Sequence, residues 1–176
     1  EDKNIISTLV NDLIKLKEKG INIIGTNVNY FSQKDKSHNT GWIMFPKSVK
    51  KGKVYNEFRR NYNLKISNNY KIVDFVSECF ILIDSSIFDK IGLLDENFFI
   101  YGEETEFSLR AWSCGYGSAI NKDLTIYHKV AATNKVGSPF SLYLKTRNVY
   151  YLLRKSKKLI QDINYFKCMY FYDFIK

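Results

Sequence analysis

The sequence predicts an α/β domain, because helix-like and strand-like segments alternate along it. An amphipathic helical pattern at residues 3–19 leads directly into a β-branched run at residues 21–24. A longer apolar run at residues 70–83 is rich in β-branched and aromatic residues, as buried strands are. Such alternation is typical of domains in which helices cover a sheet.

The individual elements follow from their local signals. Gly20 comes directly after the first helix, where a helix end favours a left-handed residue. The polar stretch at residues 32–40 predicts a loop, and Ser85 or Ser86 can cap a short helix that Gly92 ends. The remaining predicted elements are a helix from Glu103 to Cys114, strands at residues 118–120 and 124–128, a helix begun by Ser138 and Pro139 and running to about Lys158, and an aromatic tail from Ile163.

Size and composition narrow the class of protein. The 176 residues are 45% apolar and include only 2 prolines, which excludes a disordered chain. The length suits one domain of roughly 100–200 residues. No run approaches the roughly 18–20 apolar residues of a membrane-spanning helix, and charges throughout the first turns exclude a signal-peptide pattern. Because the chain begins at Glu1, directly in a helical pattern, we expect it to be a piece of a longer protein.

The cysteines and the net charge indicate the environment. Cys79, Cys114 and Cys168 are an odd number at wide spacings, with no CxxC pair and no nearby histidine to complete a zinc set. We therefore expect a reduced, cytoplasmic location. The net charge of +9 favours anionic partners, and residues 47–60 interleave basic and aromatic side chains that suit phosphates or lipid head groups. A solvated, lysine-rich loop is the alternative interpretation of that segment.

Three residues between positions 100 and 130 are candidates for chemistry. Glu103 and Glu104 open a helix behind a glycine, where one carboxylate could act as a general base. Helix capping explains the same two acids, because carboxylates are favoured in a first helical turn. His128 lies at the predicted C-terminal end of a strand and is a candidate metal ligand or a structural histidine, whereas His38 lies in a polar loop without supporting context. No glycine-rich phosphate loop, GxGxxG or GxSxG motif occurs.

One long block carries a family resemblance. The run VSECFILIDSSIFDKIGLLDENFFIYGEETEFSLRAWSCGYG, residues 76–117, is followed by Ile-Tyr-His at residues 126–128. This order resembles the second half of the family 2 glycosyltransferases, in particular the bacterial rhamnosyltransferase-like members. The resemblance covers roughly residues 1–158. It implies a partial GT-A-type fold, with a mixed sheet flanked by helices and a C-terminal helical extension.

The resemblance also implies site residues. Glu104 matches the catalytic base that deprotonates the acceptor hydroxyl, with glutamate where aspartate is usual, and Glu103 matches the acid that orients the acceptor or the base. His128 matches a ligand of the divalent metal, Mn²⁺ or Mg²⁺, beneath the donor diphosphate. Asp95 matches a common family acid to which we assign a structural role. No DxD motif occurs in the chain, so the resemblance implies the acceptor-side part without the nucleotide-binding half.

The resulting expectation is an inverting transfer from a nucleotide-sugar donor to a saccharide or lipid-linked saccharide in bacterial surface polysaccharide synthesis. We expect residues 1–137 to be the acceptor-side part of the catalytic domain, residues 138–176 to be a basic and aromatic extension, and the isolated piece to be inactive. The extension suits peripheral contact with an anionic membrane at its inner face, or packing against the parent protein.

Other protein classes stay open at this point. An inactive scaffold relative, or a basic binding module for anionic lipid or nucleic acid, would also explain the charge. No nucleic-acid motif is recognisable, so we expect no nucleic-acid partner. A homodimer is a further expectation, because a sheet cut at its nucleotide-binding side exposes an edge.

Overall fold

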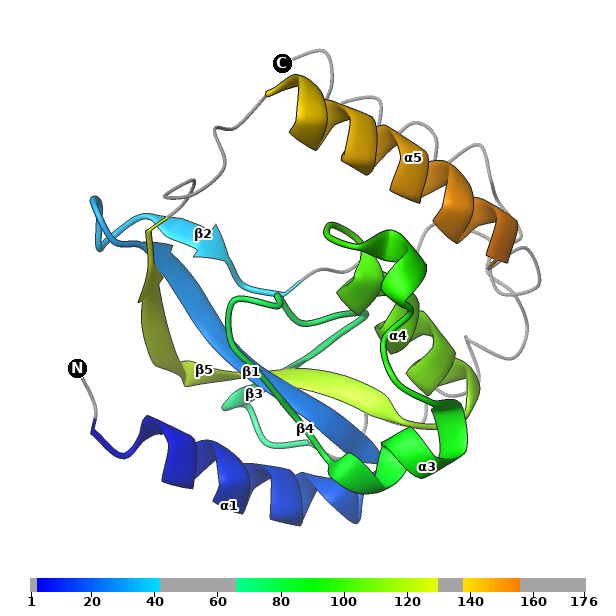
Figure 1. Cartoon of the computed structure of the whole chain (residues 1–176). Helices are drawn as coiled ribbons and strands as arrows, with labels where there is room; N and C mark the ends of the chain where they lie inside the picture. Colours follow the sequence, from blue (N-terminus) through cyan, green and yellow to red (C-terminus); the bar gives the residue numbers. More distant parts are fainter. Residues whose placement is uncertain (1–2, 42–65, 130–137, 156–176) are drawn as a thin grey trace, which may run out of the picture.

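The computed structural model describes residues 3–41, 66–129 and 138–155. It confirms the α/β class, with a mixed five-stranded sheet between helices (Figure 1). The strand order is β2-β1-β5-β3, and β4 pairs with the same edge of β1 as β2 does, further toward the start of β1. The strands are β1 (Ile21–Tyr30), β2 (Ser37–Asn39), β3 (Tyr70–Val73), β4 (Ile81–Ile83) and β5 (Gly117–His128).

The centre of the sheet is the parallel pair β1 and β5. Their register runs from Ile21 opposite Gly117 to Tyr30 opposite His128, so both strands end at the same edge. The two short strands expected at residues 118–120 and 124–128 are one strand in the structure. The prediction missed this because the register shifts there, from Thr26 opposite Asn121 to Asn27 opposite Thr125. Residues 122–124, between Asn121 and Thr125, bulge out of the ladder with β1 without ending the strand.

The apolar run at residues 70–83 is not one strand, which corrects the sequence prediction. β3 pairs with β5 and β4 pairs with β1, and residues 74–80 connect them across the sheet. An unbroken apolar run does not show whether the chain continues as one strand or crosses to another place in the sheet, because its residues are buried in both cases. Val76 of this crossover lies so close to Gly25 of β1 that a Cβ there would be 2.2 Å from Val76 Cγ1. Only glycine at position 25 permits that approach.

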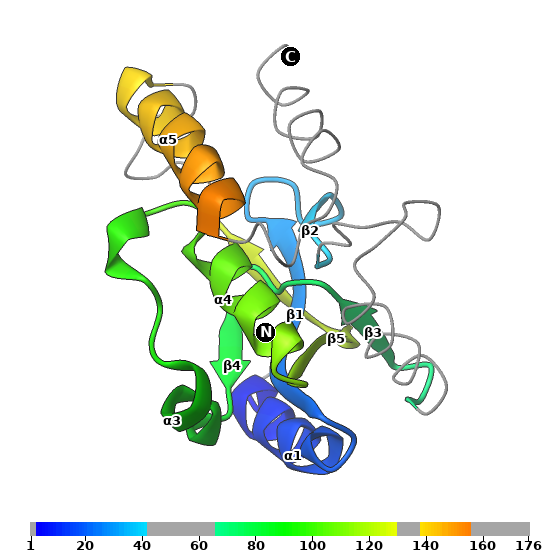
Figure 2. The same cartoon turned by 90° about the vertical axis from the view of Figure 1, so that its right-hand side faces the viewer.

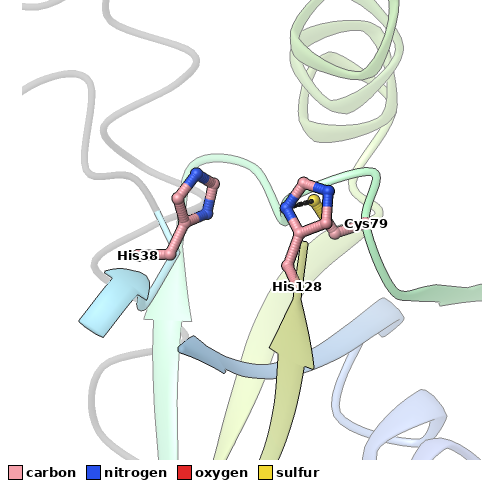
Figure 3. A group of neighbouring side chains, drawn as sticks. All are labelled: His38, Cys79 and His128. Atoms are coloured by element: carbon pink, nitrogen blue, oxygen red, sulfur yellow. Dashed lines mark hydrogen bonds between the residues drawn. The ribbon is translucent and has the colours of Figure 1, made fainter. Parts of the chain in front are cut away.

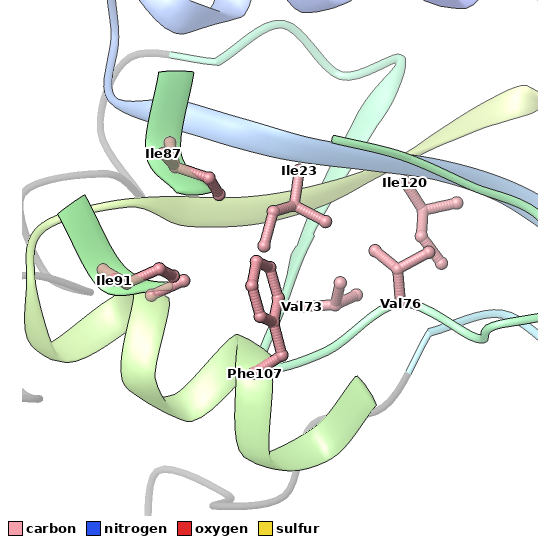
Figure 4. Close-up of a cluster of buried hydrophobic side chains, with 8 residues drawn as sticks. Ile23, Val73, Val76, Ile87, Ile91, Phe107 and Ile120 are labelled. Carbon is pink, nitrogen blue, oxygen red and sulfur yellow. The ribbon is translucent and has the colours of Figure 1, made fainter. Parts of the chain in front are cut away.

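Helices cover both faces of the sheet (Figures 1 and 2). α1 (Ile5–Lys17), predicted from its periodicity, packs one face, while α3 (Phe88–Ile91) and α4 (Glu103–Ser113) pack the other. Residues two positions apart in a strand normally share a face, but the register shift between Ile21 and Ile23 lets these two isoleucines pack on opposite faces. The cluster on the α4 side, shown in Figure 4, is Ile23, Val73, Val76, Ile87, Ile91, Phe107, Ala111 and Ile120.

The short helical segments are set by aspartates. η1 (Ser85–Ile87) is capped by Asp84, whose carboxylate accepts from the Ser86 N–H, and not by Ser85 or Ser86 as expected. Aspartate is an equally good N-cap, and the sequence offered adjacent candidates. η2 (Glu96–Phe98) is likewise capped by Asp95. Gly92 ends α3 at φ 78°, as predicted.

The last described helix is α5 (Pro139–Lys155). Its expected start is confirmed, because Ser138 Oγ accepts from the Ser141 N–H at 3.2 Å. The segment at residues 47–60, the end of the helix near Lys158 and the aromatic tail lie outside the described residues. Within residues 3–41, 66–129 and 138–155, no helix has the length and apolar character needed to cross a membrane.

Candidate functional site

The candidate residues gather where β1 and β5 end. His128 is the last residue of β5, and its carbonyl accepts from the Phe31 N–H at 3.0 Å, just beyond the end of β1. The crossover of residues 74–80 passes this edge and carries Glu78 and Cys79. The C-terminal edge of parallel strands is the usual ligand-binding edge of α/β sheets.

His38, Cys79 and His128 form one group at this edge (Figure 3). Cys79 Sγ lies 3.3 Å from His128 Nδ1, and the rings of His38 and His128 meet edge to face with their centroids 5.3 Å apart. The sequence alone shows no supporting context for His38 and indicates no histidine near a cysteine. Both statements are wrong in three dimensions, because β2 pairs with β1 and brings His38 beside the end of β5.

The surroundings of His38 favour a neutral ring. Burial, and secondarily the nearby His128, lower the pKa of His38 from its ordinary value. The Tyr30 ring packs edge to face against it at 4.9 Å between centroids. His38 Nδ1 is buried and has no hydrogen-bond partner among the described residues. A buried nitrogen without a partner is uncommon and calls for a ligand or solvent molecule.

A second group contains the predicted Glu103 and Glu104 together with Glu78, which the sequence analysis missed. One carboxylate oxygen from each lies within 4.8 Å of the others. Glu103 and Glu104 begin α4, whereas Glu78 comes from the crossover. The only signal for Glu78 was its place as an acid inside an apolar run, and that signal does not identify its partners.

Crowding of the three carboxyl groups affects how they hold protons. Burial of its carboxyl group, followed by the charge and hydrogen bond of Glu104, raises the pKa of Glu78 to about 9, although part of the side chain is exposed. Burial is also the main cause that raises the pKa of Glu103, whose Oε2 has no hydrogen-bond partner among the described residues. The group can therefore hold a proton near neutral pH.

Glu104 is oriented at the start of α4. Its Oε2 accepts from the Gly102 N–H and its Oε1 from the Thr105 hydroxyl, both at 3.2 Å. The first contact satisfies one backbone N–H at the start of α4, although the N-cap residue Gly102 has no side-chain cap, so capping explains the position of Glu104 only in part. Capping and proton transfer are compatible, because each carboxylate oxygen has more than one lone pair.

The loop before α4 has an unusual backbone that α5 holds in place. Phe99 and Tyr101 have φ values of 64° and 75°, which non-glycine residues rarely adopt. The Asn148 amide lies 2.7 to 2.8 Å from the carbonyls of Phe98, Ile100 and Tyr101. Arg147 donates to the Asn148 amide oxygen and to the Phe98 carbonyl. The sequence analysis noted the basic character of this helix and missed its role as support.

Asp95 has the structural contacts expected of it. Its carboxylate accepts from Lys155 at 2.5 Å and from the Tyr151 hydroxyl at 2.9 Å. The Lys155 hydrogen bond is the largest cause that holds the pKa of Asp95 below its usual range. Lys155 also lies 3.1 Å from Glu106 of α4, so these ion pairs join α5 to both η2 and α4.

Comparison with known proteins agrees with the resemblance at a coarse level. No family model matches the chain. Over 83 residues, 46% of the chain, it is 34% identical to the low-salt glycan biosynthesis hexosyltransferase Agl10 of Haloferax volcanii. The matched part spans 27% of that hexosyltransferase.

The two groups differ in the metal that they suit. Mg²⁺ prefers oxygen ligands, and Mn²⁺ also suits carboxylates and water. The group that contains His128 offers two ring nitrogens and a sulfur, so it does not fit the expected Mg²⁺ and is a poor match for Mn²⁺. Oxygen ligands are found instead in the glutamate group. The sequence expectation that combined His128 with Mn²⁺ or Mg²⁺ is therefore at odds with its neighbours.

Proposed function

We propose that this chain is the acceptor-side part of an inverting, GT-A-type family 2 glycosyltransferase, with Glu104 as the catalytic base. The observation that carries the proposal is the position of Glu104. It begins α4 beside Glu78 and Glu103, and Glu78 belongs to the crossover that passes the ends of β1 and β5. The similarity to a glycan biosynthesis hexosyltransferase supports sugar transfer as the reaction.

The chemistry requires one free carboxylate. The acceptor hydroxyl gives its proton to Glu104 as its oxygen bonds to the anomeric carbon, and the bond from that carbon to the nucleoside diphosphate breaks with inversion. Glu78 suits this base role less well, because its raised pKa means that it keeps its proton near pH 7. One carboxylate oxygen of Glu103 is buried, so we assign this residue the role of positioning Glu104 or the acceptor.

The donor is a nucleotide sugar and the acceptor a saccharide or lipid-linked saccharide of a bacterial surface polysaccharide, at the inner face of the cytoplasmic membrane. Three aromatic side chains of α5, Phe140, Tyr143 and Tyr150, are more than half exposed and suit the interfacial region of a membrane. The proposal also includes a divalent metal ion bound at the donor diphosphate.

The test is a nucleotide-sugar assay on the complete protein that contains this chain, with UDP-, dTDP- and GDP-sugars as donors. Glu104→Gln keeps the shape of the side chain and removes the base, so we expect turnover to fall by about 10²–10⁴-fold with donor binding retained. Glu104→Asp should recover part of the activity. Glu96→Gln, which changes an exposed acid of η2, is the matched control and should have wild-type turnover.

Two results would count against the proposal. Wild-type turnover in Glu104→Gln would remove this residue from the base role. A folded protein that releases no nucleoside diphosphate with any donor would favour an inactive scaffold or a binding module instead.

A further inference from the structure

We propose that His38, Cys79 and His128 form a binding site for a zinc-class transition metal ion. The inference goes beyond the transferase proposal, because the family resemblance implies only His128 as a metal ligand, with Mn²⁺ or Mg²⁺, and names neither His38 nor Cys79. Three separate parts of the chain supply the ligands: β2, the crossover between β3 and β4, and the end of β5.

The spacing of the ligand atoms suits a tetrahedral ion. Zinc bonds of about 2.3 Å to sulfur and about 2.0–2.1 Å to nitrogen place neighbouring sulfur and nitrogen ligands roughly 3.6 Å apart in a tetrahedron. Cys79 Sγ and His128 Nδ1 are 3.3 Å apart, and all three ligand atoms lie within 4.8 Å of one another. The Cys79 Sγ–His128 Nδ1 pair needs to lengthen by only a few tenths of an ångström, whereas the pairs that include His38 need to shorten by at most roughly 1.5 Å, through rotation of side-chain torsions.

The chemical identity of the donors selects the class of metal. Thiolate and imidazole ligands favour zinc and similar transition metals over Mg²⁺, which takes oxygen ligands. A histidine binds a metal through a neutral ring nitrogen, and His38 has a buried Nδ1 for which no described residue supplies a partner. A metal ion would satisfy that nitrogen and replace the present Cys79–His128 hydrogen bond.

The ligands are also held in place from behind. The Phe31 N–H bonds to the His128 carbonyl, and Tyr30 packs against the ring of His38. Pairing of Asn39 with Val28 fixes the strand next to His38. Support of this kind raises metal affinity, because the ligands lose less freedom on binding.

The residues that the structure describes supply three ligands for the proposed ion. No fourth His, Cys, Asp or Glu joins the group in residues 3–41, 66–129 and 138–155. Zinc sites with three protein ligands keep one position for water or a ligand oxygen, whereas structural zinc sites have four. The edge location, beside the glutamate group, suits an anionic oxygen such as that of a phosphate.

The experiment is a cobalt titration of the 176-residue chain in reduced form, followed by competition with zinc. Tetrahedral Co²⁺ bound by a thiolate has a sulfur-to-metal charge-transfer band and intense visible bands, and zinc should displace it. We expect Cys79→Ser to abolish the charge-transfer band, and His38→Gln or His128→Gln to weaken binding by at least about 100-fold. Cys114→Ser, which changes an exposed cysteine outside the group, is the matched control and should bind as the wild type does.

A measurement on the unaltered chain guards against variants that fail to fold. Zinc should slow alkylation of Cys79, followed by mass spectrometry, and leave the exposed Cys114 equally reactive. The proposal is overturned if Mg²⁺ or Mn²⁺ binds more tightly than zinc, if the charge-transfer band survives in Cys79→Ser, or if zinc leaves the alkylation rate of Cys79 unchanged. None of these readouts depends on sugar transfer, so this proposal can fail while the transferase proposal stands.

Discussion

Replacement of Asn148 by leucine should destabilise the loop that precedes the candidate base. Leucine has nearly the same size and offers no donor to the carbonyls of Phe98, Ile100 and Tyr101. Arg147 continues to bond to the Phe98 carbonyl, so the carbonyls of Ile100 and Tyr101 lose the Asn148 amide as their donor. The side chain of Asn148 is only 2% exposed, and water cannot readily take its place.

The size of the effect follows from the hydrogens available. The Asn148 amide has two N–H groups shared among three carbonyls, so it makes at most two full hydrogen bonds at a time. At about 0.5–1.5 kcal/mol for each bond, the free energy of unfolding should fall by about 1–3 kcal/mol. The upper end applies here because the site is buried and the acceptors stay in place.

Urea unfolding measures this change directly. We expect the midpoint to fall with an unchanged slope, and limited proteolysis to increase within residues 97–101. Asn69→Leu is the control, because the Asn69 amide likewise donates a hydrogen bond, here to the Asp123 carboxylate, but is exposed. This change should alter stability by less than about 0.5 kcal/mol. Equal midpoints for Asn148→Leu and the wild type would refute the view that α5 supports the loop.

Two further changes test the packing of the sheet and the attachment of α5. Gly25→Ala should lower the free energy of unfolding by about 1–3 kcal/mol, measured by heat or urea, since its Cβ would lie 2.2 Å from Val76 Cγ1. The double variant Gly25→Ala with Val76→Ala should lose less stability than the sum of the two single changes. Asp95→Asn should cost about 1–3 kcal/mol at pH 7. Because the folded pKa of Asp95 is lowered, its contribution is complete above the unfolded value of about 3.9 and is lost progressively as the pH falls from there through the folded pKa, so the difference between the two proteins in unfolding scans should shrink steadily from about pH 4 toward pH 2. A difference that stays constant from pH 7 to pH 2 would contradict this.

Local signals predicted the helices well and the strand connections poorly. α1, α4 and the start of α5 follow from periodicity, acids in a first turn and a serine-proline pair, which act within one or two helical turns. The crossover after Val73 and the register shift within β5 depend on which strand lies next to which. Contacts between distant segments decide that, and no local pattern encodes it.

The same limit applies to the candidate sites. Glu103 and Glu104 are neighbours in sequence and could be found together, whereas His38 and His128 are joined only through the pairing of β2 with β1 and of β1 with β5. Glu78 and Cys79 reach their partners because the chain leaves the sheet between β3 and β4. If residues 70–83 formed one continuous strand, as the sequence predicts, Glu78 and Cys79 would not reach the partners with which they form the two groups.

The hydrogen bonds of Asn148 and Arg147 to the loop before α4 set the shortest piece of the chain that can keep this site intact. A chain shortened to residue 137, the boundary expected from sequence, would keep every described strand and both acids at the start of α4. It would lose the donors that hold the left-handed backbone at Phe99 and Tyr101, which come from 47–50 positions further along the chain than the carbonyls they bind. Exchange of this module between relatives, or trimming for crystallisation, should therefore retain the chain through Lys155.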